Sequence, residues 1–183
     1  MDARIVRTRR SLQQALFDLA REKGIDHVAV GEIAERAGVN RSTFYQHYSD
    51  KETLLADAFD LVAEEAGAQL EGIDEQSADP PRALVDFLAH IDTHADLYRR
   101  VFLEPGYGVV LARLREHIHR AVHGAAQESA RKDPEVPLDV LAAGVAGSII
   151  GVIGAWLGRE PHASVDEAAL WVWRVLLGPA DAT

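Results

Sequence analysis

Residues 32–55 read EIAERAGVNRSTFYQHYSDKETLL, and this stretch decides the fold of the first part of the chain. A short helical pattern ends at Gly38, a residue type that turns a chain out of a helix through positive φ without steric cost. Val39 follows as an apolar plug, and a second short helix is expected over 42–48, with Phe44 and Tyr48 four residues apart on one side. Two helices joined by a tight glycine turn predict a helix-turn-helix, whose second helix enters the major groove of DNA.

The outward face of the second helix carries hydrogen-bonding side chains of the kinds that contact phosphates and base edges. These are Arg41, Ser42, Thr43, Tyr45, Gln46 and His47. Phe44 and Tyr48 are expected in the core between the two helices. Four arginines of the first helix either follow the neighbouring DNA groove or backbone, or form a solvated helix face, and the sequence leaves both alternatives open. They are Arg4, Arg7, Arg9 and Arg10.

The run from Thr43 to Tyr48, followed by Ser49-Asp50-Lys51-Glu52 and Leu54-Leu55, resembles the DNA-binding domain of the tetracycline-repressor (TetR) family of bacterial regulators. The similarity covers about residues 4–59, with tyrosine at position 48 where phenylalanine is commoner in the family. The resemblance implies phosphate contacts from Tyr45, His47 and Lys51, and base reading by Arg41, Ser42, Thr43 and Gln46. It further implies a homodimer on double-stranded DNA with an inverted repeat, released by a small-molecule effector, with repression commoner than activation.

Charge is divided unevenly along the chain. Residues 1–51 hold nine Lys/Arg and seven Asp/Glu, whereas the remainder holds ten and twenty-two. An acidic body that repels nonspecific polyanions, beside a basic end that docks, favours selective DNA binding. The chain has no cysteine, which excludes disulfides and Cys-ligated zinc. The first ten residues are charged with no apolar run behind them, so no signal peptide is expected and the predicted location is cytoplasmic.

Helical periodicity predicts an all-α protein of about nine helices, because no convincing alternating strand pattern occurs. Residues 1–49 are expected to form a three-helix helix-turn-helix domain, and residues 50–183 an effector-binding and dimerisation domain in which the fourth helix is a connecting strut. That helix should begin at a capping box of Ser49 with Glu52, and the last helix at one of Ser164 with Glu167. The remaining helices are expected at 4–23, 81–94, 95–103, 107–130 and 138–158, with loops over 72–81 and 132–137.

The segment 140–158 has no charged residue and is long enough to span a membrane. Its five glycines and the lack of flanking basic or aromatic belts favour a buried interface helix, and no membrane association is expected. Each glycine inside a helix costs about 1 kcal/mol of helix stability relative to alanine. A stripe of five glycines therefore indicates a compensating close approach of a partner helix or a ligand. The expected dimer interface comprises Gly144, Gly147, Gly151, Gly154, Trp171 and Val175; packing of the stripe inside one subunit is the alternative.

Family resemblance implies an effector pocket in the second domain, lined by apolar and aromatic side chains and suited to an apolar effector. Its candidate residues are Phe87, Ile91, His94, Phe102, Tyr107, Leu111, Leu114 and Trp156, with Leu88 and Val110 beside them. For each of these residues, ordinary core packing is the competing interpretation.

Histidine pairs at i, i+4 spacing occur at His90/His94 and His119/His123, a geometry that zinc or nickel uses. Hydrogen-bonded helix histidines are far commoner, so neither a metal nor another cofactor is expected. The sequence lacks a G-x-S-x-G motif, a cysteine nucleophile and a phosphate-binding glycine loop, so no enzyme is predicted. Two alternatives stay open: a helix-turn-helix DNA binder without an effector, and a helical-bundle metal-binding enzyme.

Overall fold

The computed structural model describes residues 3–68, 79–128 and 136–177. Within these residues the chain forms nine α-helices, one short 3₁₀ helix and no strand, which confirms the predicted all-α fold. The helices are α1 (Ala3–Lys23), η1 (Ile25–His27), α2 (Val30–Arg36), α3 (Arg41–His47), α4 (Lys51–Ala68), α5 (Arg82–Thr93), α6 (Ala95–Leu103), α7 (Gly108–Glu128), α8 (Leu138–Leu157) and α9 (Val165–Leu177). The predicted loop residues 72–78 and 132–135 and the predicted end of the last helix at 178–179 lie outside the described residues.

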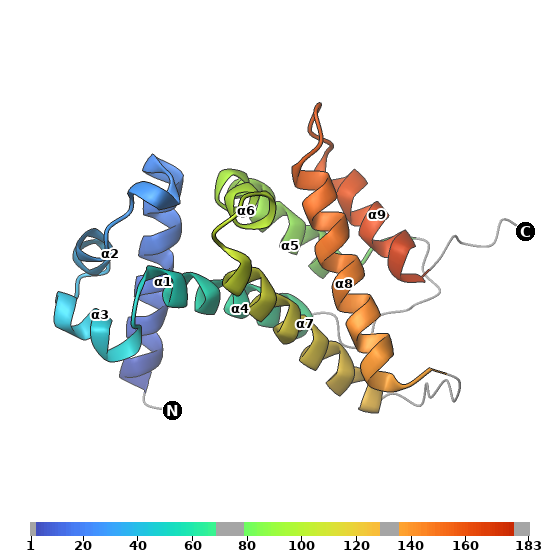
Figure 1. The fold of residues 1–183 in the computed structure, drawn as a ribbon, viewed down its shortest axis with the longest axis horizontal. Coiled ribbons are helices and arrows are strands. Elements are labelled where there is room, and N and C mark those ends of the chain that lie inside the picture. The colour runs from blue at the N-terminus through green and yellow to red at the C-terminus, as the bar shows by residue number, and fades with distance from the viewer. Residues whose placement is uncertain (1–2, 69–78, 129–135, 178–183) are drawn as a thin grey trace, which may run out of the picture.

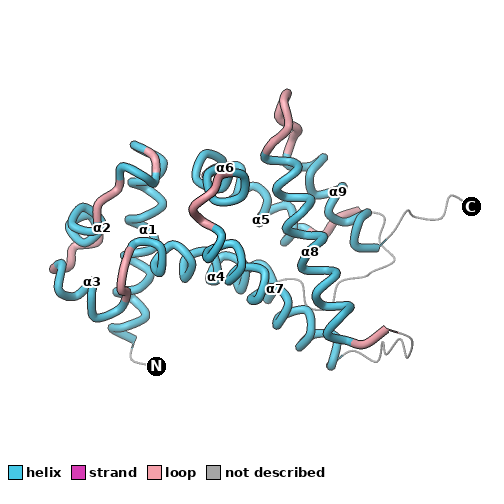
Figure 2. The backbone as a smooth tube through the Cα atoms, viewed as in Figure 1, coloured by secondary structure: helices cyan, strands magenta, loops and turns pink. Residues whose placement is uncertain are grey.

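The helices divide into a head and a body, joined by α4 (Figure 1). Helices α1, α2 and α3 form the head, whereas α5 to α9 form the body and α4 runs from one to the other. Short turns connect the helices of the head (Figure 2). The predicted domain boundary after residue 49 stays a prediction, since the two parts pack against each other.

The turn between α2 and α3 has the geometry of a helix-turn-helix. Gly38 adopts φ +68°, in the left-handed region that glycine enters without strain. The amide of Val39 then donates to the carbonyl of Ala34 at 2.9 Å, which closes the end of α2. Phe44 is fully buried and Tyr48 nearly so, which confirms their expected role in the core.

The start of α4 differs from the predicted capping box. Asp50, not Ser49, caps the helix: its Oδ1 accepts the backbone N–H of Thr53 at 2.7 Å and the Thr53 hydroxyl at 2.6 Å. These hydrogen bonds lower the pKa of Asp50. Aspartate lies one residue closer to the first turn and offers a charged acceptor, so it displaces serine there. The second predicted box is confirmed, because Ser164 N donates to Glu167 Oε2 at 2.9 Å and Glu167 N donates to Ser164 Oγ at 3.3 Å.

Helix α8 has one buried face and one exposed apolar face. The buried face carries Ala142, Ala146, Ile150, Ile153, Trp156 and Leu157. The opposite face leaves Val140 56% and Leu141 43% exposed, together with the exposed Gly144, Gly147 and Gly151. Of the described helices, α8 is the one long and apolar enough to cross a membrane by length and composition, with a mean hydropathy of 2.1.

An aromatic cluster packs α1 of the head onto α5 and α6 of the body. Phe17 lies 5.3 Å from His90 and 4.8 Å from His94, measured between ring centroids. Phe59 of α4 stacks on Tyr98 at 4.5 Å. Burial lowers the pKa of His90 to about 4, with a further contribution from His94, and burial also lowers the pKa of His94. Burial therefore favours the neutral form of both histidines where the head meets the body.

This burial makes stability sensitive to acid. A histidine with a depressed folded-state pKa stabilises the fold fully above its unfolded value near 6.5, and that stability is lost as pH falls towards 4, because the unfolded chain takes up the proton first. We expect the free energy of unfolding to fall by about 1 kcal/mol more in the wild type than in His90→Gln between about pH 7 and about pH 5, after discounting for partial solvent screening. Urea unfolding at both pH values measures this difference; equal losses in the two proteins would contradict it.

Candidate nucleic-acid interface

Helix α3 presents the predicted DNA-contact side chains on the surface of the head. Arg41, Ser42, Tyr45 and Gln46 are exposed, whereas Thr43 and His47 are half-buried. The fully buried Phe44 on the opposite side fixes the rotation of the helix, and its ring packs edge-on against Tyr45 at 5.4 Å. The sequence-predicted set is therefore brought together on one short helix, with its hydrogen-bonding groups turned outward.

Arg41 and Tyr45 hold each other one helical turn apart. An Arg41 Nη2–H donates to the Tyr45 hydroxyl at 3.3 Å, and the guanidinium lies 5.7 Å from the centre of the tyrosine ring. This pairing restricts two long side chains before any ligand arrives, which lowers the entropy lost on binding. Tyr45 remains 49% exposed.

Lys51 has a different first role from the predicted phosphate contact. Its Nζ donates to the carbonyls of Ile25 at 2.7 Å and Val28 at 3.2 Å, at the end of the 3₁₀ helix η1. An ammonium group has three N–H donors, so two are used inside the chain. Lys51 thus ties the start of α4 to the segment before α2, and a phosphate contact from its remaining donor stays a prediction.

Arg9 and Arg10 of α1 are engaged in ion pairs within the protein. Arg9 forms an ion pair with Asp57, and Arg10 lies 3.5 Å from Glu65. Neither of the two alternatives left open by the sequence, a DNA contact or a solvated helix face, describes Arg9, which is partly buried against Asp57. Arg7 is exposed on the outer surface of α1.

Asp57 of α4 is the polar centre of the junction between head and body, and sequence reasoning missed it. Its carboxylate accepts the Gln13 amide at 2.7 Å and the Tyr48 hydroxyl at 2.5 Å, in addition to the Arg9 ion pair. Arg113 of α7 lies 3.9 Å from the same carboxylate. Burial, and then the hydrogen bond to Asp57, raises the pKa of Tyr48. The sequence signal that could have identified Asp57 is a carboxylate residue within a run of apolar residues, Leu54, Leu55, Ala58 and Phe59, all of which are buried.

The predicted effector-pocket residues do not enclose one cavity. Phe87, Ile91, Phe102 and Leu114 meet around a void of about 10 Å³, about the room of one water molecule. The other four candidates lie elsewhere: His94 contacts Phe17, Tyr107 and Trp156 are buried with hydrogen-bond partners, and Leu111 packs on the core. Side chains therefore fill the interior of the body, as the core-packing interpretation expects.

Tyr107 belongs to a second contact between body and head. Its hydroxyl donates to Asp26 Oδ1 at 2.8 Å, and Arg100 lies 2.7 Å from Asp26 Oδ2. The tyrosine hydroxyl, with help from Arg100, lowers the pKa of Asp26, while burial raises the pKa of Tyr107 to about 12. The loop before α7 is thereby fastened to η1.

The predicted dimer residues lie largely on the surface. A Cβ added at Gly144, Gly147 or Gly151 would meet no other atom within 4 Å, whereas one at Gly154 would lie 3.7 Å from Phe102. On α9, Val175 is 54% exposed, and the half-buried Trp171 lies under the Arg159 guanidinium at 5.2 Å. Close approach inside this subunit therefore does not explain the first three glycines.

Each histidine pair was a candidate for a metal site. In the described part of the chain, no group of three or more His, Cys, Asp or Glu side chains is arranged to hold a metal ion. The His119 and His123 rings lie 6.1 Å apart, and His119 Nε2 contacts the carbonyl of Asp139 at 3.2 Å. His162 pairs with Asp92 at 3.0 Å and stacks on Trp156.

We expect Asp57→Asn to lower the free energy of unfolding by about 3 kcal/mol, because it removes the charge that Arg9 faces and places an N–H₂ group against donors. The control is Glu65→Gln on the same helix, which alters an exposed ion pair with Arg10 and should leave stability nearly unchanged. Urea unfolding of the three proteins measures both effects. Equal stability of Asp57→Asn and wild type would contradict the central role of Asp57.

Sequence comparisons identify the head. The sequence model of the tetR family of bacterial regulatory proteins matches residues 14–58. The HTH-type transcriptional regulator AcrR of Shigella flexneri is 30% identical over 100 residues, which cover 53% of this chain and 46% of AcrR. An uncharacterized HTH-type transcriptional regulator of Bacillus subtilis (strain 168), YxbF, is 41% identical over 56 residues, covering 30% of this chain and 15% of YxbF. The chain thus aligns with less than half the length of these curated relatives.

A structural comparison extends the similarity to the body. Thermus thermophilus FadR, a TetR family transcriptional repressor in complex with lauroyl-CoA, matches with a TM-score of 0.62 and 21% identity, covering 96% of this chain and 95% of that one. At 21% sequence identity, this match shows that the two proteins share a fold and no more. The fold is shared along nearly the whole chain, and the matched residues 14–58 contain the Gly38 turn, all of α3 and Asp57. Residues 14–58 therefore form a DNA-binding domain of the tetR family of bacterial regulatory proteins, and the chain as a whole has the fold of a TetR family repressor.

Proposed function

We propose that this chain is a cytoplasmic transcriptional regulator that binds double-stranded operator DNA as a homodimer and represses transcription. The observation that carries the proposal is α3, a helix fixed by the buried Phe44 and presenting Arg41, Tyr45 and Gln46 to solvent. A major groove admits one such helix, and these side chains match donors and acceptors on base edges and phosphates.

Two kinds of contact divide the work at the DNA. Tyr45 and His47 contact phosphates and set the position of the head, and such contacts carry no sequence information. Arg41, Ser42, Thr43 and Gln46 read base edges, where arginine pairs bidentately with guanine and glutamine with adenine. The acidic remainder of the chain keeps other surfaces away from DNA.

The homodimer forms through α8 and α9 in this proposal. An exposed face of glycine and aliphatic side chains on α8, continued by Val175 on α9, is apolar surface that a single subunit leaves in water. Glycines with open space let a twofold-related helix approach closely. Two heads then address two half-sites about one turn of DNA apart, so the operator is an inverted repeat.

A small, mostly apolar effector releases the operator in this proposal. Lauroyl-CoA bound to Thermus thermophilus FadR, a protein of the same fold, supports a ligand-responsive body. Physically, the effector must bind more tightly to the arrangement of heads that does not fit DNA, because only differential affinity shifts the equilibrium.

The deciding experiment is in vitro selection of DNA from a random pool by the purified protein, at about physiological salt because affinity depends on salt. Enrichment of an inverted repeat supports the proposal and defines the operator for genome searches. Folded protein that enriches no sequence, with and without extraction of bound small molecules, overturns it.

Single substitutions on α3 should separate the two kinds of contact. We expect Tyr45→Ala to weaken binding to all DNA sequences about equally, whereas Gln46→Ala relaxes preference at one position by about 1–3 kcal/mol. Selections repeated with each variant, alongside measured affinities for matched and mismatched duplexes, check both. The reverse pattern would contradict the assigned roles.

The dimer face can be tested independently of DNA. We expect Gly151→Arg to shift the protein to monomer, because it places a charged side chain in the proposed helix–helix contact. Gly31→Arg is the matched control: Gly31 is exposed on α2, where a Cβ also meets no other atom. Sedimentation velocity gives the mass of each; a dimeric Gly151→Arg protein would exclude this face.

A further inference from the structure

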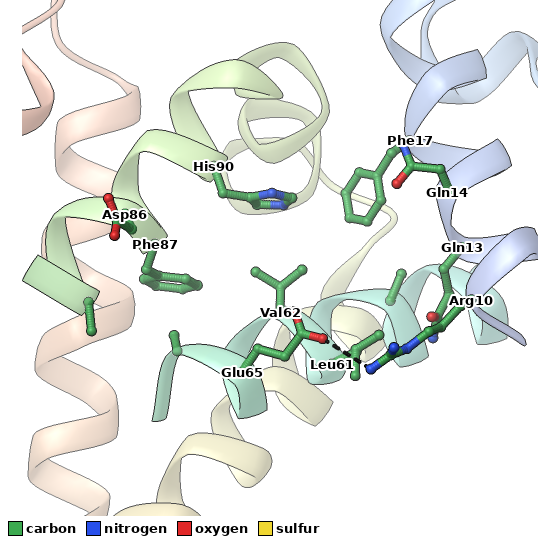
Figure 3. Close-up of a pocket in the computed structure, with 13 residues that line it drawn as sticks. Arg10, Gln13, Gln14, Phe17, Leu61, Val62, Glu65, Asp86, Phe87 and His90 are labelled. Carbon is green, nitrogen blue, oxygen red and sulfur yellow. Dashed lines mark ion pairs between the residues drawn. The ribbon is translucent and has the colours of Figure 1, made fainter. Parts of the chain in front are cut away.

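A cavity lies between head and body, and of the residues that the sequence predicted to bind an effector only Phe87 lines it. It has a volume of about 440 Å³ and is bounded by α1, α4 and α5. Figure 3 shows Phe17 and His90 projecting towards the same space from α1 and α5, with Val62 of α4 below that space in the view. This volume is within the usual range of small-molecule sites, whereas the void inside the body holds about 10 Å³.

A buried acceptor without a partner lines this cavity. Gln13 is 6% exposed, and its amide nitrogen donates to Asp57 Oδ2 at 2.7 Å. A carboxylate only accepts hydrogen bonds, so the amide nitrogen must face Asp57 and Oε1 must point away from it. Gln13 Oε1 is buried and has no hydrogen-bond partner, and neither has His90 Nε2, which lines the same cavity. Buried polar atoms are normally satisfied, so both indicate a missing partner.

The charges around the cavity favour one class of molecule. Two carboxylates, Glu65 and Asp86, line it together with one cation, Arg10, which lies 3.5 Å from Glu65 (Figure 3). His90 is neutral near pH 7, because burial lowers its pKa to about 4. Arg10 is thus already paired with Glu65, and Asp86 is paired with Arg82 at 2.9 Å, so an anion would find no free cation here. A neutral or cationic N–H donor, in contrast, would find the unpartnered Gln13 Oε1. Phe17 and Phe87 supply aromatic walls that favour a planar apolar body.

We propose that the cavity between α1, α4 and α5 is a ligand site for a planar aromatic amine, neutral or cationic, whose N–H group donates to Gln13 Oε1. The claim that this cavity is the effector site rests on the proposed function, whereas the claim that it binds such a ligand does not. A bound molecule would touch the head through α1 and the body through α5, beside the Asp57 contacts that join them. A bound ligand therefore changes the relative free energies of the head orientations directly, without rearranging the core of the body.

The test is a fluorescence anisotropy titration of DNA-free protein with 9-aminoacridine, a planar amine that is cationic at neutral pH. Acridine-9-carboxylate, which has the same ring system and an anionic group, is the matched probe. We expect the amine to bind at least about tenfold more tightly than the carboxylate, because the amine donates to Gln13 Oε1, whereas the carboxylate only accepts hydrogen bonds and finds Arg10 already paired with Glu65. Equal binding of the two probes, or no binding of the amine, overturns the proposal.

Three variants locate the site. Ala66→Phe adds a ring at a half-buried wall position of the cavity and should weaken amine binding by about tenfold or more. Gln13→Met keeps the volume but removes the acceptor, and should weaken binding by about fivefold. Glu65→Gln should weaken the amine several-fold and strengthen the carboxylate probe. Its matched control is Glu64→Gln, an exposed neighbour on α4 outside the cavity lining, which should change neither.

Thermal melting of each variant establishes that it is folded; if Ala66→Phe fails to fold, the Glu65→Gln and Glu64→Gln pair decides alone. Unchanged amine binding in all the folded lining variants overturns the proposed site. DNA affinity without probe is measured in the same preparations. Wild type that binds an inverted repeat but no amine refutes this inference alone, whereas amine binding by protein that selects no DNA refutes the proposed function and leaves the ligand site standing.

Discussion

One buried carboxylate determines how the head is held on the body. Asp57 lies on α4, the helix common to both parts, and collects hydrogen bonds from α1 and from the residue that ends α3, with Arg113 of α7 nearby. A carboxylate at 11% side-chain exposure is costly to leave unpaired, so the donors must stay where they are or move together. The orientation of α3 is thus linked to the position of α4, because Tyr48 connects them.

Two further contacts restrict the same junction. Tyr107 and Arg100 fasten Asp26 of η1 to the body, and Phe17 packs among the histidines of α5. All three contacts are small and largely polar or aromatic, in contrast to the aliphatic core of each part. Polar contacts of this kind depend steeply on geometry, so a displacement of α4 or α5 breaks or remakes them rather than deforming them gradually. Phe17 and His90 also line the cavity at Gln13.

Helix α8 shows a different constraint. Its buried face is satisfied by α7 and α9, yet its glycine face remains apolar and open within one subunit. Apolar surface on both sides of a helix requires two partners. One partner is present in the fold, and the proposed homodimer supplies the other, which also fixes the distance between the heads.

The sequence by itself determined what depends on neighbours a few residues away. Periodicity located the helices, Gly38 located the turn, and the Ser164–Glu167 box located the start of α9, because each rests on backbone geometry within one turn of helix. The same local pattern predicted that, on α3, Phe44 faces the core and Gln46 faces solvent. For the start of α4 the sequence predicted Ser49 as the cap, whereas Asp50 caps the helix, since the local pattern fits both residues.

Only the tertiary structure decided what depends on residues far apart in the chain. The sequence suggested Lys51 as a phosphate ligand, whereas in the fold its ammonium group donates to a carbonyl of η1. Asp57 binds Gln13 and Arg9, which lie 44 and 48 residues away in the sequence. The cavity is set by how far α1 stands from α5, a distance that no local pattern encodes. Long-range packing chooses among side-chain partners that are equivalent in the sequence, because burial and hydrogen-bond satisfaction are properties of the assembled fold.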